Sequence, residues 1–232
     1  MSHVIRHRGP DESDFIVRDS FCAAFRRLSI IDLDHGSQPY TSPDGRFTAV
    51  FNGEIYNYRD LRAPLQEEGI EFFTNSEIEV IVALYRKYGP DFVKMLRGMF
   101  AIMINDGDEK NCFVCRDPFG IKPLYYREEK DRVVFASEMK AFLFDEEMGG
   151  FDVDKKSLQN YFTFQYVPEP KTMTGKVRAL EASHYMMLSA SGIEKVVQYE
   201  DYRFQTPSKG SFEAKAEKLR KVLTESVEYH MI

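Results

Sequence analysis

The chain has 232 residues, of which 43% are hydrophobic and 29% charged, and its formal net charge is -6. This composition is that of an ordinary globular protein, which argues against disorder, and the acidic balance argues against non-specific binding of nucleic acid. No apolar run approaches the roughly 20 residues that span a bilayer, and three cysteines cannot build a disulfide framework, so we expect a cytoplasmic protein without a membrane segment.

The predicted elements alternate between short strands and a few helices. A strand over 48–51 leads into Asn52-Gly53, and the spacing of apolar residues predicts helices over 58–68 and 77–88. Pro64 predicts a late start or a kink in the first of these helices, because proline lacks a backbone donor. Further strands are predicted over 99–104, 112–115, 122–126, 132–136, 184–188 and 194–199, and short helices over 92–96, 137–143 and 155–162.

The composition of the sequence changes near its C-terminal end. Residues 203–210 have the composition of a linker, and Ser211 is a predicted N-cap for an amphipathic helix that runs almost to residue 232. The apolar face of that helix carries Phe212, Leu219, Leu223 and Val227. We expect three parts: a domain over 1–202, a linker over 203–210, and the first helix of a further domain over 211–232.

Asn52-Gly53 allows two interpretations. A strand that ends in this dipeptide can aim a side-chain amide and a backbone N–H at one point, and an oxyanion needs two such donors during acyl transfer. Asn-Gly is also the commonest hairpin turn, and on spacing alone the turn is favoured.

Three other features have similar alternatives. Arg27 can hold a carboxylate through two N–H groups, or form a surface salt bridge. Glu77 opens a predicted helix, where an acidic group suits the helix dipole or meets a ligand ammonium. Cys112 and Cys115 form a CxxC pair without a second pair or nearby histidines, so no metal site is predicted. The sequence also contains no recognisable glycine-rich phosphate loop.

Seven short segments together resemble one known family. In chain order they are His7-Arg8-Gly9-Pro10-Asp11, residues 27–32, Gln38-Pro39, and residues 51–57, 96–101, 116–126 and 137–141. This succession resembles the glutaminase domain of glutamine-hydrolysing asparagine synthetase, a class II glutamine amidotransferase, over roughly residues 4–202. The resemblance implies an α+β fold, a four-layer αββα sandwich of the N-terminal-nucleophile hydrolase type, with its first strand missing.

The resemblance also assigns roles to residues. It implies that Asn52 and Gly53 form the oxyanion hole, and that Arg27 holds the α-carboxylate of glutamine. The position of Glu77 normally carries an aspartate that meets the α-ammonium, and the longer glutamate changes the reach of the carboxylate. The complete glutamine-binding set that the resemblance implies is Arg27, Leu28, Ser29, Ile30, Ile31, Asn52, Gly53, Glu54 and Glu77.

The family's nucleophile has no counterpart among the cysteines of this sequence. In the family it is a cysteine at the mature N-terminus, whose own α-amine acts as the base. The residues before His7 include no cysteine, Ser2 is too close to His7 to lie on the missing strand, and Cys22 is internal and lacks a free amine. We therefore expect this polypeptide to be inactive, and we expect the missing strand to cause low stability or association.

The implied parent reaction converts ATP, aspartate and glutamine to asparagine, glutamate, AMP and diphosphate. We expect no cofactor or metal in this chain, because ATP and Mg²⁺ belong to the synthetase domain. The expected partners are L-glutamine and that C-terminal synthetase domain, and a homodimer is a further option. Two alternatives stay open: a non-catalytic glutamine-binding or partner-capping domain, and an amidotransferase domain that serves a different acceptor.

Overall fold

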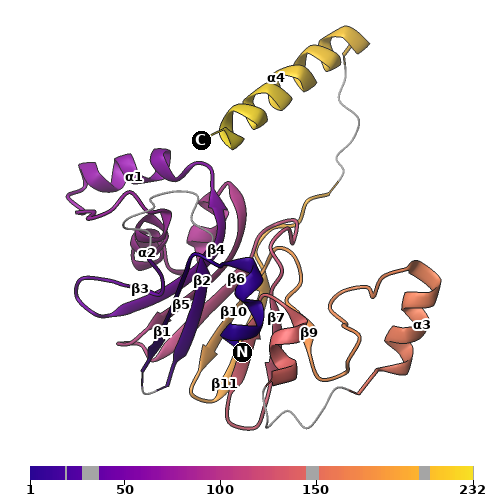
Figure 1. Cartoon of the computed structure of the whole chain (residues 1–232). Coiled ribbons are helices and arrows are strands. Elements are labelled where there is room, and N and C mark those ends of the chain that lie inside the picture. Colours follow the sequence, from indigo (N-terminus) through magenta and orange to yellow (C-terminus); the bar gives the residue numbers. More distant parts are fainter. Residues whose placement is uncertain (19, 28–36, 145–151, 204–209, 232) are drawn as a thin grey trace.

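The computed structural model describes residues 1–18, 20–27, 37–144, 152–203 and 210–231 (Figure 1). Within these residues, the largest sheet has the strand order β11-β10-β6-β5-β4-β3, and two smaller sheets have the orders β8-β7-β9 and β1-β2. Every pairing of these strands is antiparallel.

The strands are β1 (Glu12–Val17), β2 (Cys22–Arg27), β3 (Tyr40–Thr41), β4 (Phe47–Ile55), β5 (Gly98–Asp106), β6 (Asn111–Arg116), β7 (Tyr125–Glu128), β8 (Val133–Ala136), β9 (Arg178–Ala179), β10 (His184–Ser189) and β11 (Gly192–Gln198). The helices are η1 (Ser2–Arg8), α1 (Tyr58–Glu67), α2 (Glu77–Tyr88), η2 (Gly89–Met95), η3 (Met139–Phe144), α3 (Lys155–Phe164) and α4 (Phe212–His230).

One face of the six-stranded sheet is closed by α2. Ile78 and Ile81 of this helix are fully buried in the main core cluster. At its other end, the ring of Tyr85 lies 5.8 Å from that of Phe92 and 5.3 Å from that of Phe113 on β6. Such aromatic pairs add to the stability that burial alone provides.

The opposite face of this sheet packs on the sheet β8-β7-β9. Val114 and Leu188 from the large sheet share a second core cluster with Leu124, and Phe135 of β8 packs against it. A third cluster joins the far side of the small sheet to η3 through Phe142 and Val177. The layers are therefore helix, sheet, sheet and helix, which confirms the predicted α+β sandwich.

Most predicted elements are present. The helix predicted over 77–88 has those bounds, and the strand pairs around 99–115, 122–136 and 184–199 are all found. Of the late start or kink expected from Pro64, the late start is wrong, since α1 begins at Tyr58 and continues through Pro64. Leu65, the next residue, is buried in the main core, and this packing offsets the one donor that proline lacks.

The hairpin of β1 and β2 was not predicted. Its residue types show why, because polar and apolar residues do not alternate in β1 (ESDFIV) or in β2 (CAAFRR). The signal for a half-buried strand is alternation, and this hairpin lacks it.

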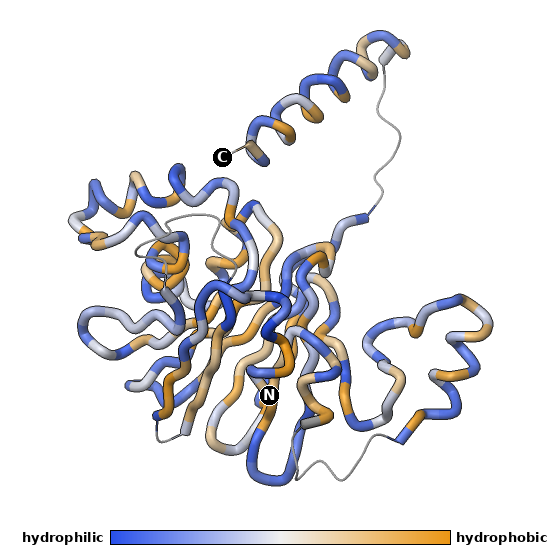
Figure 2. Tube along the Cα trace, viewed as in Figure 1, coloured by the Kyte–Doolittle hydropathy of each residue, from blue (hydrophilic) through white to orange (hydrophobic). Residues whose placement is uncertain are grey.

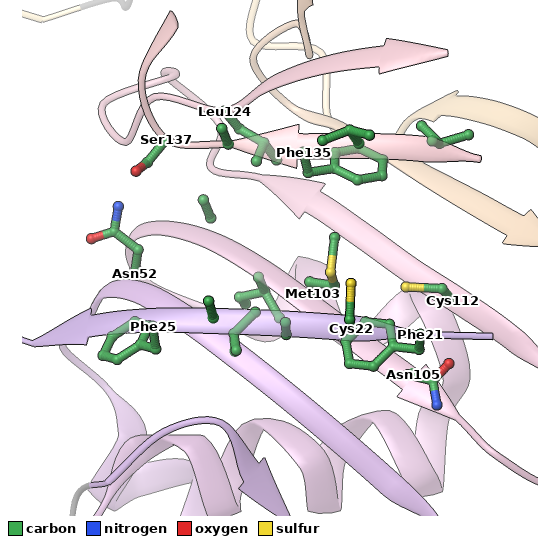
Figure 3. Close-up of a pocket in the computed structure, with 18 of the residues that line it drawn as sticks. Phe21, Cys22, Phe25, Asn52, Met103, Asn105, Cys112, Leu124, Phe135 and Ser137 are labelled. Atoms are coloured by element: carbon green, nitrogen blue, oxygen red, sulfur yellow. The ribbon is translucent and has the colours of Figure 1, made fainter. Parts of the chain in front are cut away.

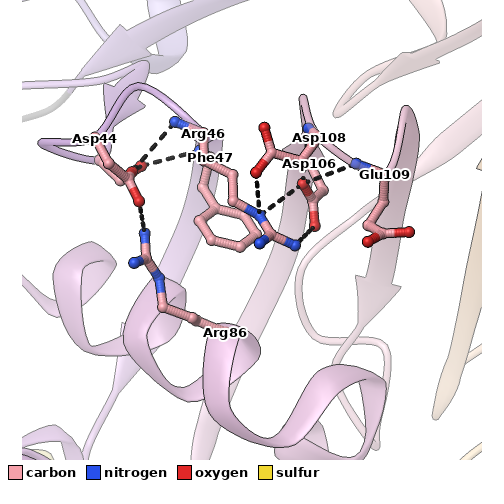
Figure 4. A network of polar contacts seen from close by, with 8 residues as sticks. Asp44, Arg46, Phe47, Arg86, Asp106, Asp108 and Glu109 are labelled. Atoms are coloured by element: carbon pink, nitrogen blue, oxygen red, sulfur yellow. Dashed lines mark hydrogen bonds and ion pairs between the residues drawn. The ribbon is translucent and has the colours of Figure 1, made fainter.

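A network of ion pairs stabilises the N-terminal end of β4 (Figure 4). Arg46 donates two hydrogen bonds to Asp106, at 2.9 and 2.7 Å. Arg86 of α2 donates to Asp44 at 2.6 Å, and both guanidinium groups lie within 5 Å of the Phe47 ring centroid, at 4.8 and 4.9 Å. These contacts attach the β4–β5 pair to α2.

Helix α4 stands away from the sheets (Figures 1 and 2). The predicted N-cap is confirmed, since the Ser211 side chain accepts a hydrogen bond from the Ala214 N–H at 3.3 Å. At the other end, the His230 ring lies 4.1 Å from the Tyr56 ring. All four residues of the predicted apolar face are exposed, and residues 204–209 of the predicted linker lie outside the described residues.

Candidate functional site

A cavity of about 1150 Å³ lies on the side of the large sheet that faces away from α2. It is lined by residues of β2, β4, β5 and β8 (Figure 3). In the described part of the chain β2 pairs only with β1, and β8 pairs only with β7. The cavity is therefore bordered by two strands that each have one edge without a strand partner.

Five predicted site residues line this one cavity. They come from three separate segments of the sequence and are Arg27, Asn52, Gly53, Glu54 and Glu77. The other four, Leu28, Ser29, Ile30 and Ile31, lie outside the described residues. The fold thus brings together every predicted site residue whose position it describes.

Asn52 and Gly53 do not form a turn, so the interpretation favoured by spacing is wrong. They lie inside β4, which stays paired with β5 as far as Ile55 opposite Gly98. A Cβ on Gly53 would lie 2.0 Å from the Met99 carbonyl oxygen, and Gly53 has a φ of 155°. A Cβ on Gly98 would lie 2.1 Å from the Glu54 carbonyl oxygen. Glycine is required here because the two backbones approach closely.

The hydrogen-bond pattern between β4 and β5 determines the direction in which the Gly53 N–H points. Gly53 lies opposite Phe100 in the register of β4 and β5. The N–H of Phe100 donates to Asp117 Oδ2 at 3.3 Å, and its carbonyl accepts from the Asp117 N–H at 2.8 Å. Because both backbone groups of Phe100 are used on the β6 side, Gly53 and Phe100 are a non-hydrogen-bonded pair. The Gly53 N–H therefore leaves β4 on the edge that faces away from β5.

Two side chains hold the neighbouring N–H groups on that edge. The Phe51 N–H donates to Gln38 Oε1 at 2.6 Å, and the Ile55 N–H donates to Glu77 Oε1 at 2.5 Å. Alternate residues of a strand direct their N–H groups to the same edge, so that of Gly53 lies between these two. Sequence reasoning missed the contribution of Gln38, although the motif that contains it was noticed.

Glu77 is a buried carboxylate at the border of the cavity. Burial raises its pKa to about 8, the Ile55 N–H opposes that rise, and the charge of Glu54 adds to it. Burial also raises the pKa of Glu54, against the nearby cation of Lys122. Burial thus favours the protonated form of both carboxylates. A ligand cation bound nearby would favour their ionised form.

Arg27 ends β2 and is 8% exposed. Its carbonyl accepts a hydrogen bond from the Asp11 N–H at 3.1 Å, and a Cβ on Gly9 would lie 2.4 Å from its backbone nitrogen. The segment that contains Gly9 and Asp11 therefore packs directly on Arg27. An ion pair with Glu12 exists, with 3.3 Å between Nη1 and Oε2, but the Arg27 side chain is buried, and Arg27 is one of the residues that line the cavity.

The motif at 116–126 serves the structure. Asp117 is fully buried, and its side chain accepts hydrogen bonds from the N–H groups of Phe119, Ile121 and Lys122 at 2.9 to 3.0 Å. The Gly120 N–H donates to the Asp117 carbonyl at 3.1 Å, which closes a turn over residues 117–120. This turn brings Lys122 to the cavity wall.

Two motifs that are distant in the sequence meet beside the site. His7 Nε2 lies 2.9 Å from Glu138 Oε1, and Arg8 lies 3.4 Å from the same oxygen. Lys140 lies 3.1 Å from the other oxygen of Glu138. No pattern in the sequence signals this cluster, because its two segments lie about 130 residues apart.

None of the three cysteines lies beside Asn52. Cys115 is buried in the α2 core, and burial raises the pKa of Cys112 to about 12. Cys22 lines the cavity with Phe21 and Cys112, whereas Asn52 lies near Phe25 (Figure 3). Cys22 and Phe25 are three positions apart on β2, which is about 10 Å at roughly 3.3 Å per residue.

The described residues lack two features. They contain no group of three or more histidine, cysteine or acidic side chains that could hold a metal ion. They also contain no helix that is both long and apolar enough to cross a membrane.

Comparisons with known proteins identify the family of this chain. The family model of the glutamine amidotransferase domain matches residues 1–200. Asparagine synthetase [glutamine-hydrolyzing] 1 of Bacillus subtilis is 39% identical over 238 residues, which covers 100% of this chain and 36% of the relative. Asparagine synthetase B of Escherichia coli is 41% identical over 144 residues, covering 62% of this chain and 26% of the relative. The chain thus spans about a third of the length of these curated relatives.

Solved structures share the fold. The glutamine phosphoribosylpyrophosphate amidotransferase from B. subtilis superposes with a TM-score of 0.62 at 20% identity, over 86% of this chain and 45% of that one. The allosteric regulatory enzyme of purine biosynthesis gives a TM-score of 0.52 at 22% identity, over 71% of this chain and 31% of that one. With the match to the family model, these findings establish that the chain belongs to the glutamine amidotransferase domain family, as a glutaminase domain of the asparagine synthetase type.

Proposed function

We propose that the cavity binds L-glutamine at the end formed by β4, Arg27 and Glu77. The observation that carries this proposal is the convergence of five residues with complementary chemistry on one cavity. A guanidinium, two carboxylates and a side-chain amide are the groups needed to recognise an α-carboxylate, an α-ammonium and an amide.

Each of these residues contacts a different part of glutamine in this proposal. Arg27 holds the α-carboxylate, and the α-ammonium meets Glu77, whose Oε1 already accepts from the Ile55 N–H. The side-chain carbonyl of glutamine accepts hydrogen bonds from the Asn52 amide and from the Gly53 N–H. The Gly53 N–H is available because it points away from β5. Two such donors would also stabilise a tetrahedral oxyanion, because they are fixed before the charge develops. Glu54 supplies a further contact to the substrate.

We further propose that this 232-residue polypeptide does not hydrolyse glutamine. Acyl transfer of this kind needs a nucleophile next to the oxyanion donors. Cys115 faces the opposite side of the sheet, Cys112 has a raised pKa, and Cys22 is several residues away along β2. The described residues therefore place no cysteine at Asn52 and Gly53.

In a longer protein the site would serve the synthesis of asparagine. There, glutamine would provide ammonia, and a C-terminal synthetase domain would activate aspartate with ATP and Mg²⁺. The support for this step is the similarity to asparagine synthetases over the whole of this chain. ATP and Mg²⁺ would be bound by residues of the synthetase domain, and the exposed apolar face of α4 would pack within that domain.

Calorimetry with the full 232-residue chain tests the binding proposal. We expect saturable binding of L-glutamine, and we expect Asn52→Ala to weaken it by five- to tenfold, since a net hydrogen bond contributes about 1 kcal/mol. Asn105→Ala is the matched control, because Asn105 lines the other end of the same cavity (Figure 3). Absence of binding, or equal losses in the two variants, would contradict the proposal.

A glutamate-release assay tests the proposed inactivity. We expect no glutamate above a control without protein when glutamine is incubated with sequence-verified protein. Release that is abolished in Cys22→Ser would refute the proposal and identify that cysteine as the nucleophile.

A further inference from the structure

Glu12 lies directly opposite Arg27 in the register of β1 and β2. Its Oε2 is 3.3 Å from Arg27 Nη1, and its Oε1 accepts a hydrogen bond from the Ser37 hydroxyl at 2.8 Å. Both carboxylate oxygens therefore have defined partners. The three side chains form a chain of contacts that leads from Ser37 through Glu12 to the guanidinium.

Glu12 and Arg27 have different surroundings. Arg27 lines the cavity, whereas Glu12 is not among the residues that line it, and its side chain is 37% exposed. The carboxylate thus contacts the guanidinium from outside the cavity.

A buried guanidinium on a long side chain needs such an anchor. A buried charge is costly unless it is paired, and an arginine loses considerable rotamer entropy when it is held in one geometry. A carboxylate on the neighbouring strand reduces both costs before a ligand arrives, and preorganisation of this kind increases affinity. Directly opposite residues on paired strands are close enough to interact in this way.

We propose that Glu12, held by Ser37, is a positioning residue that orients Arg27 to receive the α-carboxylate of an amino-acid ligand. The proposal rests on the proposed binding of glutamine and adds a residue to it. Its consequence is specific: Glu12 influences only ligands that carry an α-carboxylate.

Calorimetry on the full chain with two ligands tests this consequence. L-Glutamine carries the carboxylate, and 4-aminobutanamide is the same molecule without it. We expect Glu12→Ala to weaken binding of L-glutamine about tenfold and to leave binding of 4-aminobutanamide unchanged. Asp14→Ala is the matched control, because it removes one negative charge from the same face of β1, two residues away. It should change neither affinity.

Two additional variants separate positioning from a loss of folding. Glu12→Gln keeps the size of the side chain and an acceptor oxygen, and we expect an intermediate loss for L-glutamine alone. In an Arg27→Ala background, Glu12→Ala should have no further effect, because Glu12 acts through Arg27. Equal weakening of both ligands by Glu12→Ala, or an unchanged affinity for L-glutamine, would overturn the proposal.

Chemical labelling of Arg27 distinguishes this proposal from the binding proposal. Phenylglyoxal modifies arginine side chains, and mass spectrometry reports the rate at Arg27 without any ligand. We expect a several-fold faster modification in Glu12→Ala than in the unchanged chain or in Asp14→Ala. If the unchanged chain binds no glutamine, the binding proposal fails. A faster rate in Glu12→Ala then still supports anchoring by Glu12, and an unchanged rate rejects it.

Discussion

The two faces of the six-stranded sheet differ in what they do. One face is closed by α2, and its aromatic and aliphatic side chains are almost completely buried. The other face is partly covered by a small sheet and otherwise borders a cavity of about 1150 Å³. Neighbouring residues of β5 illustrate the contrast, since Ile102 is 1% exposed in the core while Met103 lines the cavity (Figure 3).

This difference shows how one sheet can combine a closely packed core with an open cavity. Close packing on the α2 side holds β4 and β5 in register, which fixes the backbone at Asn52 and Gly53. The cavity side leaves the polar groups of those strands open to a ligand. Glu77 lies at the boundary, because it begins α2 and also lines the cavity.

The largest expected effect is the pH dependence of stability that Glu77 causes. The folded chain holds the proton of Glu77 up to about pH 8, whereas the unfolded chain releases it near the ordinary value of 4.5. The folded state thus binds more protons between these pH values, and stability falls as pH rises through this range, by up to about 5 kcal/mol. Glu77→Gln should remove this loss.

Thermal melts at pH 5 and pH 9 measure it. We expect Glu77→Gln to raise the melting temperature at pH 9 and to have little effect at pH 5. Glu109→Gln, a change at an exposed carboxylate, serves as the control. An equal effect of Glu77→Gln at both pH values would show that the carboxylate does not carry the cost.

The next effect separates the two faces directly. Ile102→Ala removes a fully buried side chain from the closed face and should cost about 3 kcal/mol of unfolding free energy. Met103→Ala acts on the adjacent residue and should cost about 1 kcal/mol or less, because it enlarges an existing cavity. Urea unfolding measures both values. Similar losses would mean that the cavity face is as closely packed as the core.

The smallest effect is expected outside the sandwich. Leu223 on α4 is 57% exposed, so Leu223→Gln should change the unfolding free energy by less than about 0.5 kcal/mol. Denaturant unfolding followed by circular dichroism provides the measurement. A loss above 1 kcal/mol would indicate that the apolar face of α4 is covered in solution, for example by a second copy. The expected low stability or association of the chain stays a prediction.

The sequence predicted the fold through its motifs more than through its periodicity. The helix over 77–88 could be derived from apolar spacing alone, because a strongly amphipathic segment ends at Gly89. The β1–β2 hairpin could not, because polar and apolar residue types do not alternate along either strand. The four-layer arrangement came only from the resemblance to a family.

Asn52 and Gly53 show the limit of local reasoning. Their residue types favour a turn, but pairing with β5 and the close approach of Gly98 keep them in a strand. A local propensity of this size is overridden when a whole ladder of hydrogen bonds and a buried core oppose it.

The sequence by itself determined which residue types are available: a guanidinium, an amide, two carboxylates and a glycine within recognisable motifs. Only the tertiary structure decided that Arg27 lines the cavity with Glu12 behind it, and that Gln38 and Glu77 flank the Gly53 N–H. The physical reason is that these contacts depend on strand register and on burial. Both result from packing between segments that are distant in the chain, so no local pattern encodes them.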